Sequence, residues 1–420
     1  MSGFAIRAMA EAARAASRVL AGATGATKNA ALAAMAAGLL DGRERILAAN
    51  AEDVESASSA STPPAFVDRL TLTPPRLEGM ARGLLRIADL PDPVGEVTGM
   101  WRRPNGLQIG RMRVPLGVIG IIYESRPNVT ADAAGLCLKS GNAVILRGGR
   151  EALCTNAAIG GMLAGAVASV GLPAACLAVV PTPDRAVVKE MLTLSELIDL
   201  IIPRGGEELI RMIREGSRIP VIAHDKGVCH TYVDAGADLA MAAEIAYNAK
   251  VERPGVCNAM ETLLVHAGVA EAFLPACVAR LNRTGVEVRG CPGTCAVVPG
   301  VRPATEADWD TEYLDLVLSI RVVASFDEAV AHIARHGSGL AEAIVTSDHG
   351  RAMRFLREVD AGAVFVNAST RFTDGGEFGM GAEMGISTQK LHARGPMGLT
   401  ELTCQKFIVL GDGQVRDSRR

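Results

Sequence analysis

From about residue 115 onward, the sequence alternates short, wholly apolar segments with longer amphipathic ones. The first series has strand-length apolar runs and helical patterns in turn: 117–122, 131–140, 143–146, 151–170, 178–180, 197–202 and 207–214. Strands that are apolar on both sides need cover on both faces, which helices provide when they connect the strands of a parallel sheet. A second series extends from 228 to about 366. The 420 residues therefore predict an α/β fold with two doubly wound parallel-sheet domains.

Two segments lie outside this alternation. Residues 1–94 have helical periodicity, and residues 99–114 contain two strand-like runs around Asn105-Gly106, a dipeptide typical of tight hairpin turns. We expect a helical region followed by a β-hairpin. The hairpin is either an arm that projects from its domain or a surface ribbon on it.

Composition excludes several classes of protein. The formal net charge is −3 and aromatic residues are 4% of the chain, which argues against a protein that binds nucleic acid or anionic lipid. The most apolar stretch, 160–180, is interrupted by Gly171 and Pro173, so we expect a buried helix and a strand and no membrane span. Nine scattered cysteines without a CxxC pair indicate free thiols in a reducing compartment. A soluble, intracellular protein is expected.

The strand-to-helix junctions could hold a phosphorylated cofactor. No GxGxxG follows the first strand, but Gly-Gly pairs occur in Arg147-Gly148-Gly149-Arg150 and in Arg204-Gly205-Gly206. Glycine permits close approach of a phosphate, arginine pairs with it, and a helix N-terminus favours an anion. A plain turn explains either junction by itself. Two such junctions in one parallel domain, each with an arginine, favour a phosphorylated cofactor.

One cysteine has a setting suited to a nucleophile. Cys257 follows Pro254-Gly255, which forces a loop, and Arg253 supplies positive charge that favours a thiolate. The other eight cysteines are expected to be packing residues, and the same role remains open for Cys257. Further along, dense glycines after the strand 363–366 predict a long loop over residues 371–383, of the kind that is often functional.

The sequence resembles the γ-glutamyl phosphate reductases (glutamate-5-semialdehyde dehydrogenases) of the aldehyde dehydrogenase superfamily. The similarity extends essentially from end to end and is densest in six segments: 123–130, 137–149, 248–250, 253–258, 312–316 and 372–397. The resemblance implies an aldehyde-dehydrogenase-like fold. It also implies NADPH-dependent reduction of γ-glutamyl phosphate to glutamate 5-semialdehyde and phosphate, the second step of proline biosynthesis.

The resemblance assigns the chemistry to particular residues. Cys257 matches the catalytic cysteine, which would hold the glutamyl group as a thioester. The Cys257 backbone N–H and the Asn128 amide match the donors to the oxyanion, with Arg126 as the competing match for Asn128. Arg126, Arg371 and Glu383 are the candidate substrate-binding residues.

The cofactor positions follow in the same way. Arg147 matches a lysine that touches the adenosine ribose, and Arg150 lies near any 2′-phosphate. Gly205 and Gly206 match the junction beside the pyrophosphate, and Glu312 matches the glutamate that binds the nicotinamide ribose. NADPH or NADP is the expected cofactor, and no metal is expected.

Departures from the superfamily pattern define the alternatives. His224 stands where hydrolytic aldehyde dehydrogenases have a base glutamate, which argues against the first alternative, an NAD(P)-dependent aldehyde dehydrogenase that releases a free acid. Leu340 and Ala341 replace a His and a Ser or Thr on an expected substrate-side loop. That loss suggests the second alternative, a catalytically silent nucleotide-binding oligomer.

The resemblance also implies an organisation. We expect an NADP-binding domain from residues 1–94 and 115–225, a catalytic domain from 226–396, and an oligomerisation arm from 95–114 and 397–413. A homo-oligomer (dimer or tetramer) in the cytoplasm is expected. No kinase segment precedes residue 1, so we expect a stand-alone reductase with transient contact to glutamate 5-kinase.

Overall fold

The structure is a computed structural model that describes residues 4–60, 62, 64–223 and 226–416. The chain folds into two units. Unit 1 comprises residues 1–223, 380–385 and 397–420, and unit 2 comprises residues 224–379 and 386–396. Each unit is described by itself below.

Unit 1 is built on a four-stranded parallel sheet. Its strands are β3 (Val118–Tyr123), β4 (Ala143–Arg147), β5 (Leu177–Val179) and β6 (Leu200–Arg204), in the order β5-β4-β3-β6. Every residue of β3 is buried, so both faces of the sheet are covered, as the apolar runs predicted. The strand order reverses between β3 and β6, and this switch point is where parallel sheets commonly bind ligands.

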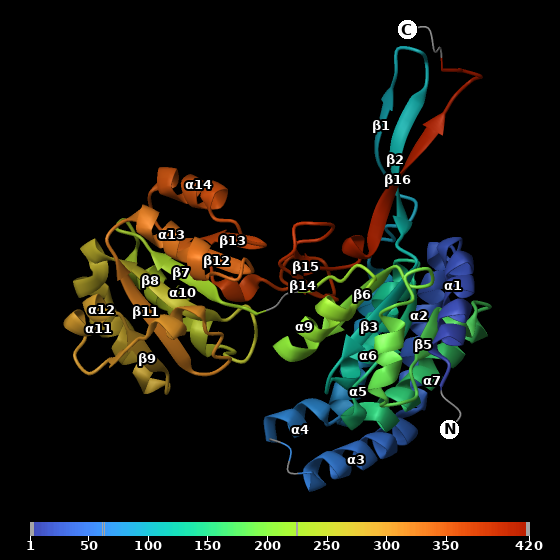
Figure 1. Cartoon of the computed structure of the whole chain (residues 1–420), viewed down its shortest axis with the longest axis horizontal. Coiled ribbons are helices and arrows are strands. Elements are labelled where there is room, and N and C mark those ends of the chain that lie inside the picture. Colours follow the sequence, from blue (N-terminus) through green and yellow to red (C-terminus); the bar gives the residue numbers. More distant parts are fainter. Residues whose placement is uncertain (1–3, 61, 63, 224–225, 417–420) are drawn as a thin grey trace. The chain divides into compact units, whose positions relative to one another are not determined.

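Helices surround this sheet in the predicted manner. The helices are α1 (Ile6–Ala21), α2 (Gly25–Asp41), α3 (Arg43–Ser59), α4 (Pro64–Leu70), α5 (Pro74–Asp89), α6 (Pro127–Lys139), α7 (Leu153–Ser169), α8 (Arg185–Met191) and α9 (Glu207–Gly216). α1, α8 and α9 contribute to one apolar cluster on the sheet. α6 contacts β3 and β4, α7 contacts β5, and α2 and α5 pack on α6 (Figure 1).

Three details differ from the sequence prediction. The helix expected at 131–140 begins at Pro127, because proline is favoured in the first turn, where its missing N–H costs nothing. The helix expected from residue 151 starts with the 3₁₀ turn Arg150–Ala152 before α7. The short helix α8 was not predicted.

The stretch Arg150–Ser169 is the one helical segment, within the described residues, that is long and apolar enough to cross a membrane by length and composition. Its residues Ile159, Leu163 and Val167 are buried, and α7 contacts α2, α3 and β5. This packing is that of a core helix, as predicted for the apolar stretch that begins at residue 160.

Unit 2 contains a seven-stranded parallel sheet. Its strands are β7 (Cys229–Val233), β8 (Met260–His266), β9 (Glu287–Gly290), β10 (Arg302–Pro303), β11 (Val317–Val323), β12 (Ala341–Val345) and β13 (Ala363–Val366), in the order β10-β9-β11-β8-β7-β12-β13. The helices are α10 (Leu239–Val251), α11 (Ala267–Arg283), α12 (Pro292–Val297), α13 (Phe326–His336) and α14 (His349–Glu358).

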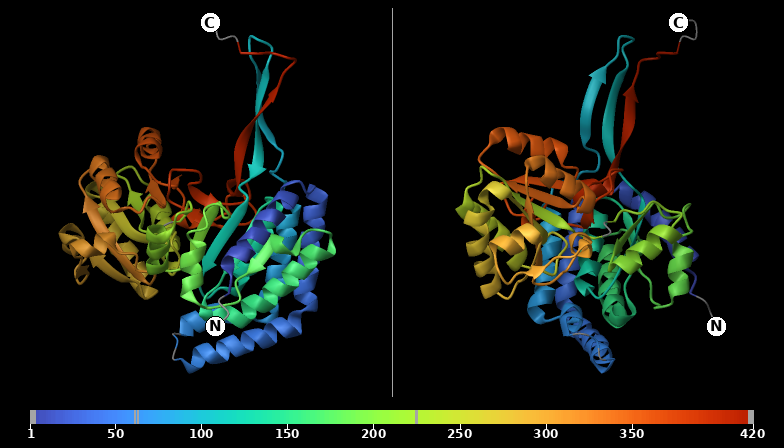
Figure 2. Two further views of the ribbon diagram at one scale, coloured as in Figure 1. Left: turned by 45° about the vertical axis from the view of Figure 1, so that its right-hand side comes forward. Right: turned by 60° about the vertical axis from the view of Figure 1, so that its left-hand side comes forward.

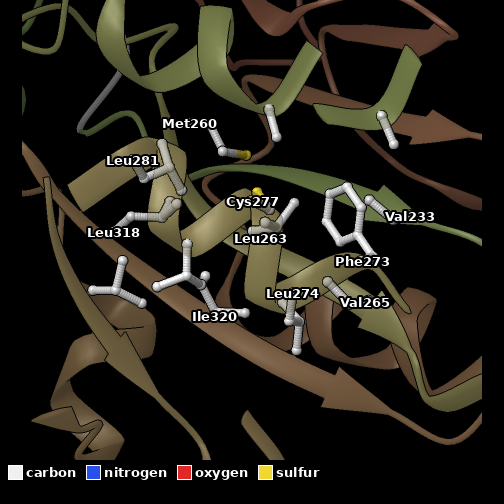
Figure 3. Close-up of a cluster of buried hydrophobic side chains, with 14 of the residues drawn as sticks. Val233, Met260, Leu263, Val265, Phe273, Leu274, Cys277, Leu281, Leu318 and Ile320 are labelled. Atoms are coloured by element: carbon white, nitrogen blue, oxygen red, sulfur yellow. The ribbon is translucent and has the colours of Figure 1, made fainter. Parts of the chain in front are cut away.

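Both faces of the unit 2 sheet are packed. On one face, Met260, Leu263 and Val265 of β8 meet Phe273 and Cys277 of α11 (Figure 3). On the other face, Leu264 of the same strand packs with side chains of α13 and α14. The second doubly wound sheet predicted from the sequence is therefore confirmed.

A three-stranded antiparallel ribbon extends from unit 1 (Figures 1 and 2). It consists of β1 (Val97–Arg102), β2 (Gln108–Pro115) and β16 (Thr403–Leu410) in the order β1-β2-β16. Residues Arg103–Leu107 make the turn, with Gly106 at φ 91° as the Asn-Gly signal predicted. The pairing of the C-terminal segment with the hairpin is confirmed, since Thr403 lies opposite Pro115 and Leu410 opposite Gln108.

Candidate active site

The candidate nucleophile lies in a loop at the amino end of β8. This cysteine loop, residues 252–259, follows α10, turns at Pro254 and Gly255, and closes with a hydrogen bond from the Ala259 N–H to the Val256 carbonyl (3.1 Å). The Cys257 side chain is half-buried. Cys154 and Cys404 are exposed, so the expectation that all other cysteines are packing residues is wrong for these two, and exposure alone does not single out Cys257.

The backbone of Cys257 rests on the start of β7. A Cβ built on Gly227 would lie 2.0 Å from the Cys257 carbonyl oxygen, so only glycine fits there. The Cys229 thiol donates to the same oxygen at 3.3 Å. Burial raises the pKa of Cys229 well above its usual range, which keeps this thiol protonated as a donor.

A second contact joins the cysteine loop to the segment after β13. The Asn258 side-chain amide donates to the Thr373 carbonyl (2.8 Å), and the Thr370 hydroxyl donates to the Asn258 carbonyl (2.8 Å). Arg371 donates from Nη1 to the Asn258 side-chain oxygen and from Nε to Glu252 (2.6 Å). Arg371 is thus held next to Cys257 by Glu252 and Asn258, which lie before and after this cysteine in the sequence.

A third contact joins the cysteine loop to the segment before β11. Residues 311–316, called here the Glu312 loop, follow the 3₁₀ turn Glu306–Asp310. Within it, the Leu314 N–H donates to Glu261 Oε1 at 3.3 Å. A Cβ on Gly255 would lie 3.6 Å from the Leu314 carbonyl oxygen, so the two loops lie side by side. Glu312 itself is half-buried.

A buried ion pair lies directly behind these loops. Lys250 Nζ is 2.6 Å from Glu261 Oε2, and both side chains are almost fully buried. Burial raises the pKa of Glu261 to about 7 against the opposing effect of Lys250, and burial lowers the pKa of Lys250.

In unit 1 the candidate cofactor residues lie at the carboxyl edge of the sheet. Arg147 ends β4, is half-buried, and donates from Nη2 to the Pro183 carbonyl (2.9 Å), while its buried Nε has no partner among the described residues. Burial lowers the pKa of Arg147. Arg150 begins the next turn and is exposed. Glu151 accepts hydrogen bonds from the N–H and hydroxyl of Ser125, after β3.

The Gly205-Gly206 junction lies at the switch point between β3 and β6. Gly206 is the N-cap of α9, and a Cβ there would meet nothing within 4 Å. Its N–H donates to Glu124 Oε2 at 3.0 Å. A Cβ on Gly205 would lie 2.5 Å from that same oxygen, so Gly205 is needed for the approach of a protein carboxylate. The expected phosphate approach at this glycine stays a prediction.

The remaining candidates of unit 1 lie near the same edge. Arg126 is the N-cap of α6, and Asn128 lies in its first turn, where its amide donates to Asp132 Oδ2 (3.2 Å). Glu383 is half-buried in the short segment 380–385, whose Gly385 lies beside the Arg204 side chain at the end of β6.

The structure therefore groups the predicted residues into two sets. Arg126, Asn128, Arg147, Arg150, Gly205, Gly206 and Glu383 belong to unit 1, and Cys257, Glu312 and Arg371 belong to unit 2. His224 lies outside the described residues. Leu340 and Ala341, expected on a substrate-side loop, are fully buried and belong to an apolar cluster that packs against Cys257.

The unit 1 edge fits a phosphorylated dinucleotide. The buried Arg147 Nε has no acceptor among the described residues, and Arg150 is exposed. A Cβ on Gly206 would meet nothing within 4 Å, so the space beside this glycine is open. Arginine donors and a helix N-terminus are the groups that bind phosphate in parallel sheets.

Sequence reasoning missed the residues that hold the cysteine loop in place. Lys250 and Asn258 lie within the segments that carry the family resemblance, whereas Gly227 and Glu261 lie outside them, and none of the four received a role. The role of Asn258 could have been predicted from the sequence, because this polar residue directly follows the candidate nucleophile. The roles of Gly227 and Glu261 could not have been predicted, because they depend on contacts with segments distant in sequence.

The chain is similar to known proteins both in sequence and in structure. The aldehyde dehydrogenase family model matches residues 4–294 and 295–407. A gamma-glutamyl phosphate reductase from Caldanaerobacter subterraneus is 57% identical over 93% of this chain and 94% of that protein. One from Desulfatibacillum aliphaticivorans is 56% identical over 97% and 98%. The crystal structure of gamma-glutamyl phosphate reductase from Thermotoga maritima has a TM-score of 0.97 at 49% identity and covers 98% of this chain and 100% of that one.

Proposed function

This chain belongs to the aldehyde dehydrogenase family and, within it, to the gamma-glutamyl phosphate reductases, and we propose that Cys257 is the nucleophile with which it reduces γ-glutamyl phosphate to glutamate 5-semialdehyde. The chain is an oxidoreductase, and the reaction is the second step of proline biosynthesis. The observation that carries the proposed role of Cys257 is the loop itself: a half-buried thiol in a loop that contacts Gly227 and Cys229, the segment after β13 and the Glu312 loop.

The Cys257 thiolate attacks the acyl carbon of the substrate. A C–S bond forms, the C–O bond to phosphate breaks, and phosphate leaves, so that the glutamyl group remains as a thioester on Sγ. The Cys257 N–H and the Asn128 amide, or Arg126 in its place, donate to the developing oxyanion. We assign Arg371, which Glu252 and Asn258 hold beside Cys257, to the binding of a substrate carboxylate.

We propose NADPH as the electron donor. When bound, its nicotinamide supplies the hydride that, with one proton, converts the thioester to the thiohemiacetal, which releases the aldehyde and restores the thiol. Arg147 and Arg150 would hold the adenosine end, Gly205 and Gly206 the pyrophosphate, and Glu312 the nicotinamide ribose. The partnerless Arg147 Nε and the open space at Gly206 support this assignment.

The reverse reaction is the direct test. Purified protein should reduce NADP in the presence of glutamate 5-semialdehyde only when phosphate is added, and arsenate should replace phosphate. NADP reduction without either anion, with free glutamate as product, would identify the hydrolytic aldehyde dehydrogenase instead. Binding of NADPH without turnover in any direction would identify the silent oligomer.

We also propose that the ribbon of β1, β2 and β16 mediates homo-oligomerisation. It exposes large apolar side chains on a small sheet: Val97, Met100, Trp101, Phe407, Val409 and Leu410. Trp101 and Phe407 meet edge to face with ring centroids 6.4 Å apart. Exposed apolar clusters of this kind mark protein interfaces. Light scattering should show a dimer or tetramer that Phe407→Glu converts to a monomer, whereas a monomeric wild type would contradict the role.

Two further expectations accompany this function. We expect the reaction to take place in the cytoplasm, where the nine free thiols would remain reduced. The labile acyl phosphate favours transient contact with the glutamate 5-kinase that produces it. Pull-down of the kinase with the reductase during turnover tests that contact.

A further inference from the structure

We propose that Glu261 is a positioning residue that fixes the Glu312 loop against the cysteine loop. This inference rests on the function proposed above for Cys257 and Glu312 and extends it to a residue that touches neither substrate nor cofactor. It is argued entirely within unit 2.

The position of Glu261 in its strand is irregular. In the pairing of β7 with β8, Cys229 lies opposite Met260 and His230 lies opposite Thr262, so Glu261 has no partner in the ladder. Such a bulge redirects a side chain and is common beside active sites. It also explains why Met260 shares a face with Leu263, against the alternation of a regular strand.

Each carboxylate oxygen of Glu261 has its own partner. Oε2 is 2.6 Å from Lys250 Nζ, and Lys250 lies in the last turn of α10, which leads directly into the cysteine loop. Oε1 accepts the Leu314 N–H at 3.3 Å in the Glu312 loop. One side chain thus joins the entry of the cysteine loop to the loop that carries Glu312.

The conformation of Leu314 shows why such a contact is needed. Its φ is 54°, in the left-handed region that a leucine seldom adopts. The N–H of Leu314 is held by Glu261, and its carbonyl faces Gly255, two residues before Cys257. An unfavourable backbone conformation persists only when its surroundings impose it, and here the surroundings are the cysteine loop and Glu261.

The second anchor of the Glu312 loop is Tyr313, which lies between Glu312 and Leu314 in the sequence. The Tyr313 hydroxyl donates to Asp308 Oδ1 at 2.8 Å, and the Tyr313 ring lies 5.8 Å from Lys250 Nζ. Glu312 therefore precedes Tyr313, whose side chain is held by Asp308, and Leu314, whose backbone is held by Glu261. Lys250 contacts both Glu261 and the Tyr313 ring.

The experiment compares two double variants without a buried charge. Lys250→Met/Glu261→Gln keeps an oxygen that accepts the Leu314 N–H, whereas Lys250→Met/Glu261→Met removes it at similar side-chain length. We expect NADPH, measured by quenching of protein fluorescence, to bind about tenfold more weakly to the Met/Met variant than to the Met/Gln variant, because a lost hydrogen bond to a buried acceptor changes affinity on that scale. The rate of Cys257 alkylation by iodoacetamide should also differ between the two.

The controls separate this inference from its premise. Both variants must show the same cooperative unfolding, and Glu244→Gln, which removes an exposed acid on the same helix α10, should leave the NADPH affinity as in the wild type. Equal NADPH affinity in the two double variants, with Glu312→Gln still weakening NADPH, overturns the role of Glu261. If Glu312→Gln leaves NADPH affinity unchanged while the double variants differ, the proposed role of Glu312 fails and that of Glu261 stands.

Discussion

The candidate cofactor residues of unit 1 and the cysteine and Glu312 loops of unit 2 lie at opposite ends of the strands of their sheets. In unit 1, Arg147 ends β4 and Gly205 follows β6, at the carboxyl edge where open α/β sheets usually bind ligands. In unit 2, Cys257 and Glu312 precede β8 and β11, at the amino edge. Two sheets of one architecture thus carry these candidate residues at different edges.

The carboxyl edge of unit 2 explains the difference. At its switch point between β7 and β12, Asp234 is fully buried and accepts hydrogen bonds from Tyr232 (3.0 Å), Thr346 (2.7 Å) and Arg351 (2.6 Å). These bonds satisfy the carboxylate and hold its pKa below its usual range despite burial. At this switch point, where a parallel sheet usually has a ligand crevice, Asp234 and its three hydrogen-bond donors pack together. The candidate site of unit 2 is formed instead by the cysteine loop and the Glu312 loop at the amino edge.

The largest effect should come from the nucleophile of unit 2. Cys257→Ala removes the atom that carries the acyl group, so turnover should fall about 10⁴-fold or more. NADPH binding, which we assign mainly to unit 1, should remain within about twofold, because a thiol-to-methyl change removes little contact area. Stopped-flow turnover and fluorescence titration measure the two quantities. Substantial residual turnover would reject Cys257 as the nucleophile.

The next effect compares how closely the backbone is packed at Gly227 of unit 2 and at Gly206 of unit 1. A Cβ at Gly227 would lie 2.0 Å from the Cys257 carbonyl, so Gly227→Ala must displace the cysteine loop. We expect about a 100-fold loss of turnover, because small displacements of a reacting group cost that much. Gly206→Ala is the matched control in unit 1, where the added methyl meets nothing within 4 Å, and its Tm should be unchanged. Equal Tm values in the two variants would contradict the difference in packing.

Sequence predicted the two sheets and the hairpin, because these depend on local patterns, whereas the role of Cys257 stays a prediction. Apolar runs such as 117–122 must be covered on both faces, and Asn105-Gly106 favours one turn geometry. What it missed depends on contacts between distant segments. The bulge at Glu261 is visible only from the pairing with β7, and the requirement for glycine at position 227 arises from the carbonyl of residue 257. The family resemblance supplied residue roles that periodicity could not.

A smaller effect concerns the cofactor edge of unit 1. Arg150 is exposed at the end of β4, next to the half-buried Arg147. Arg150→Glu places a negative charge where we expect the 2′-phosphate, so the preference for NADPH over NADH should fall about tenfold, or about 1.4 kcal/mol. The ratio of kcat/KM for the two cofactors measures it, with Arg185→Glu on the neighbouring helix α8 as a control for charge alone. An unchanged ratio in Arg150→Glu would remove Arg150 from the cofactor site.

The last effect is a pH dependence of stability, and it belongs to the buried acid behind the unit 2 site. Burial raises the pKa of Glu261 from 4.5 to about 7, with Lys250 opposing the shift and Glu312 adding to it. Between these pH values the folded chain keeps a proton that the unfolded chain has lost, so the stability this group contributes is complete below about pH 4.5 and is lost as the pH rises to about 7. The slope is at most about 1.4 kcal/mol per pH unit.

Glu261→Gln removes this titration but keeps the shape of the side chain. The free energy of unfolding of the wild type minus that of Glu261→Gln, from denaturant curves at several pH values, should therefore decrease as the pH rises from 5 to about 7. Glu244 is the control, because its hydrogen bond from Arg280 lowers its pKa below 4.5: the difference for Glu244→Gln should stay flat from pH 5 to 7 and should decrease only at lower pH. A difference for Glu261→Gln that stays flat across this range would show that burial does not retain the proton, and that the carboxylate behind the cysteine loop is charged throughout.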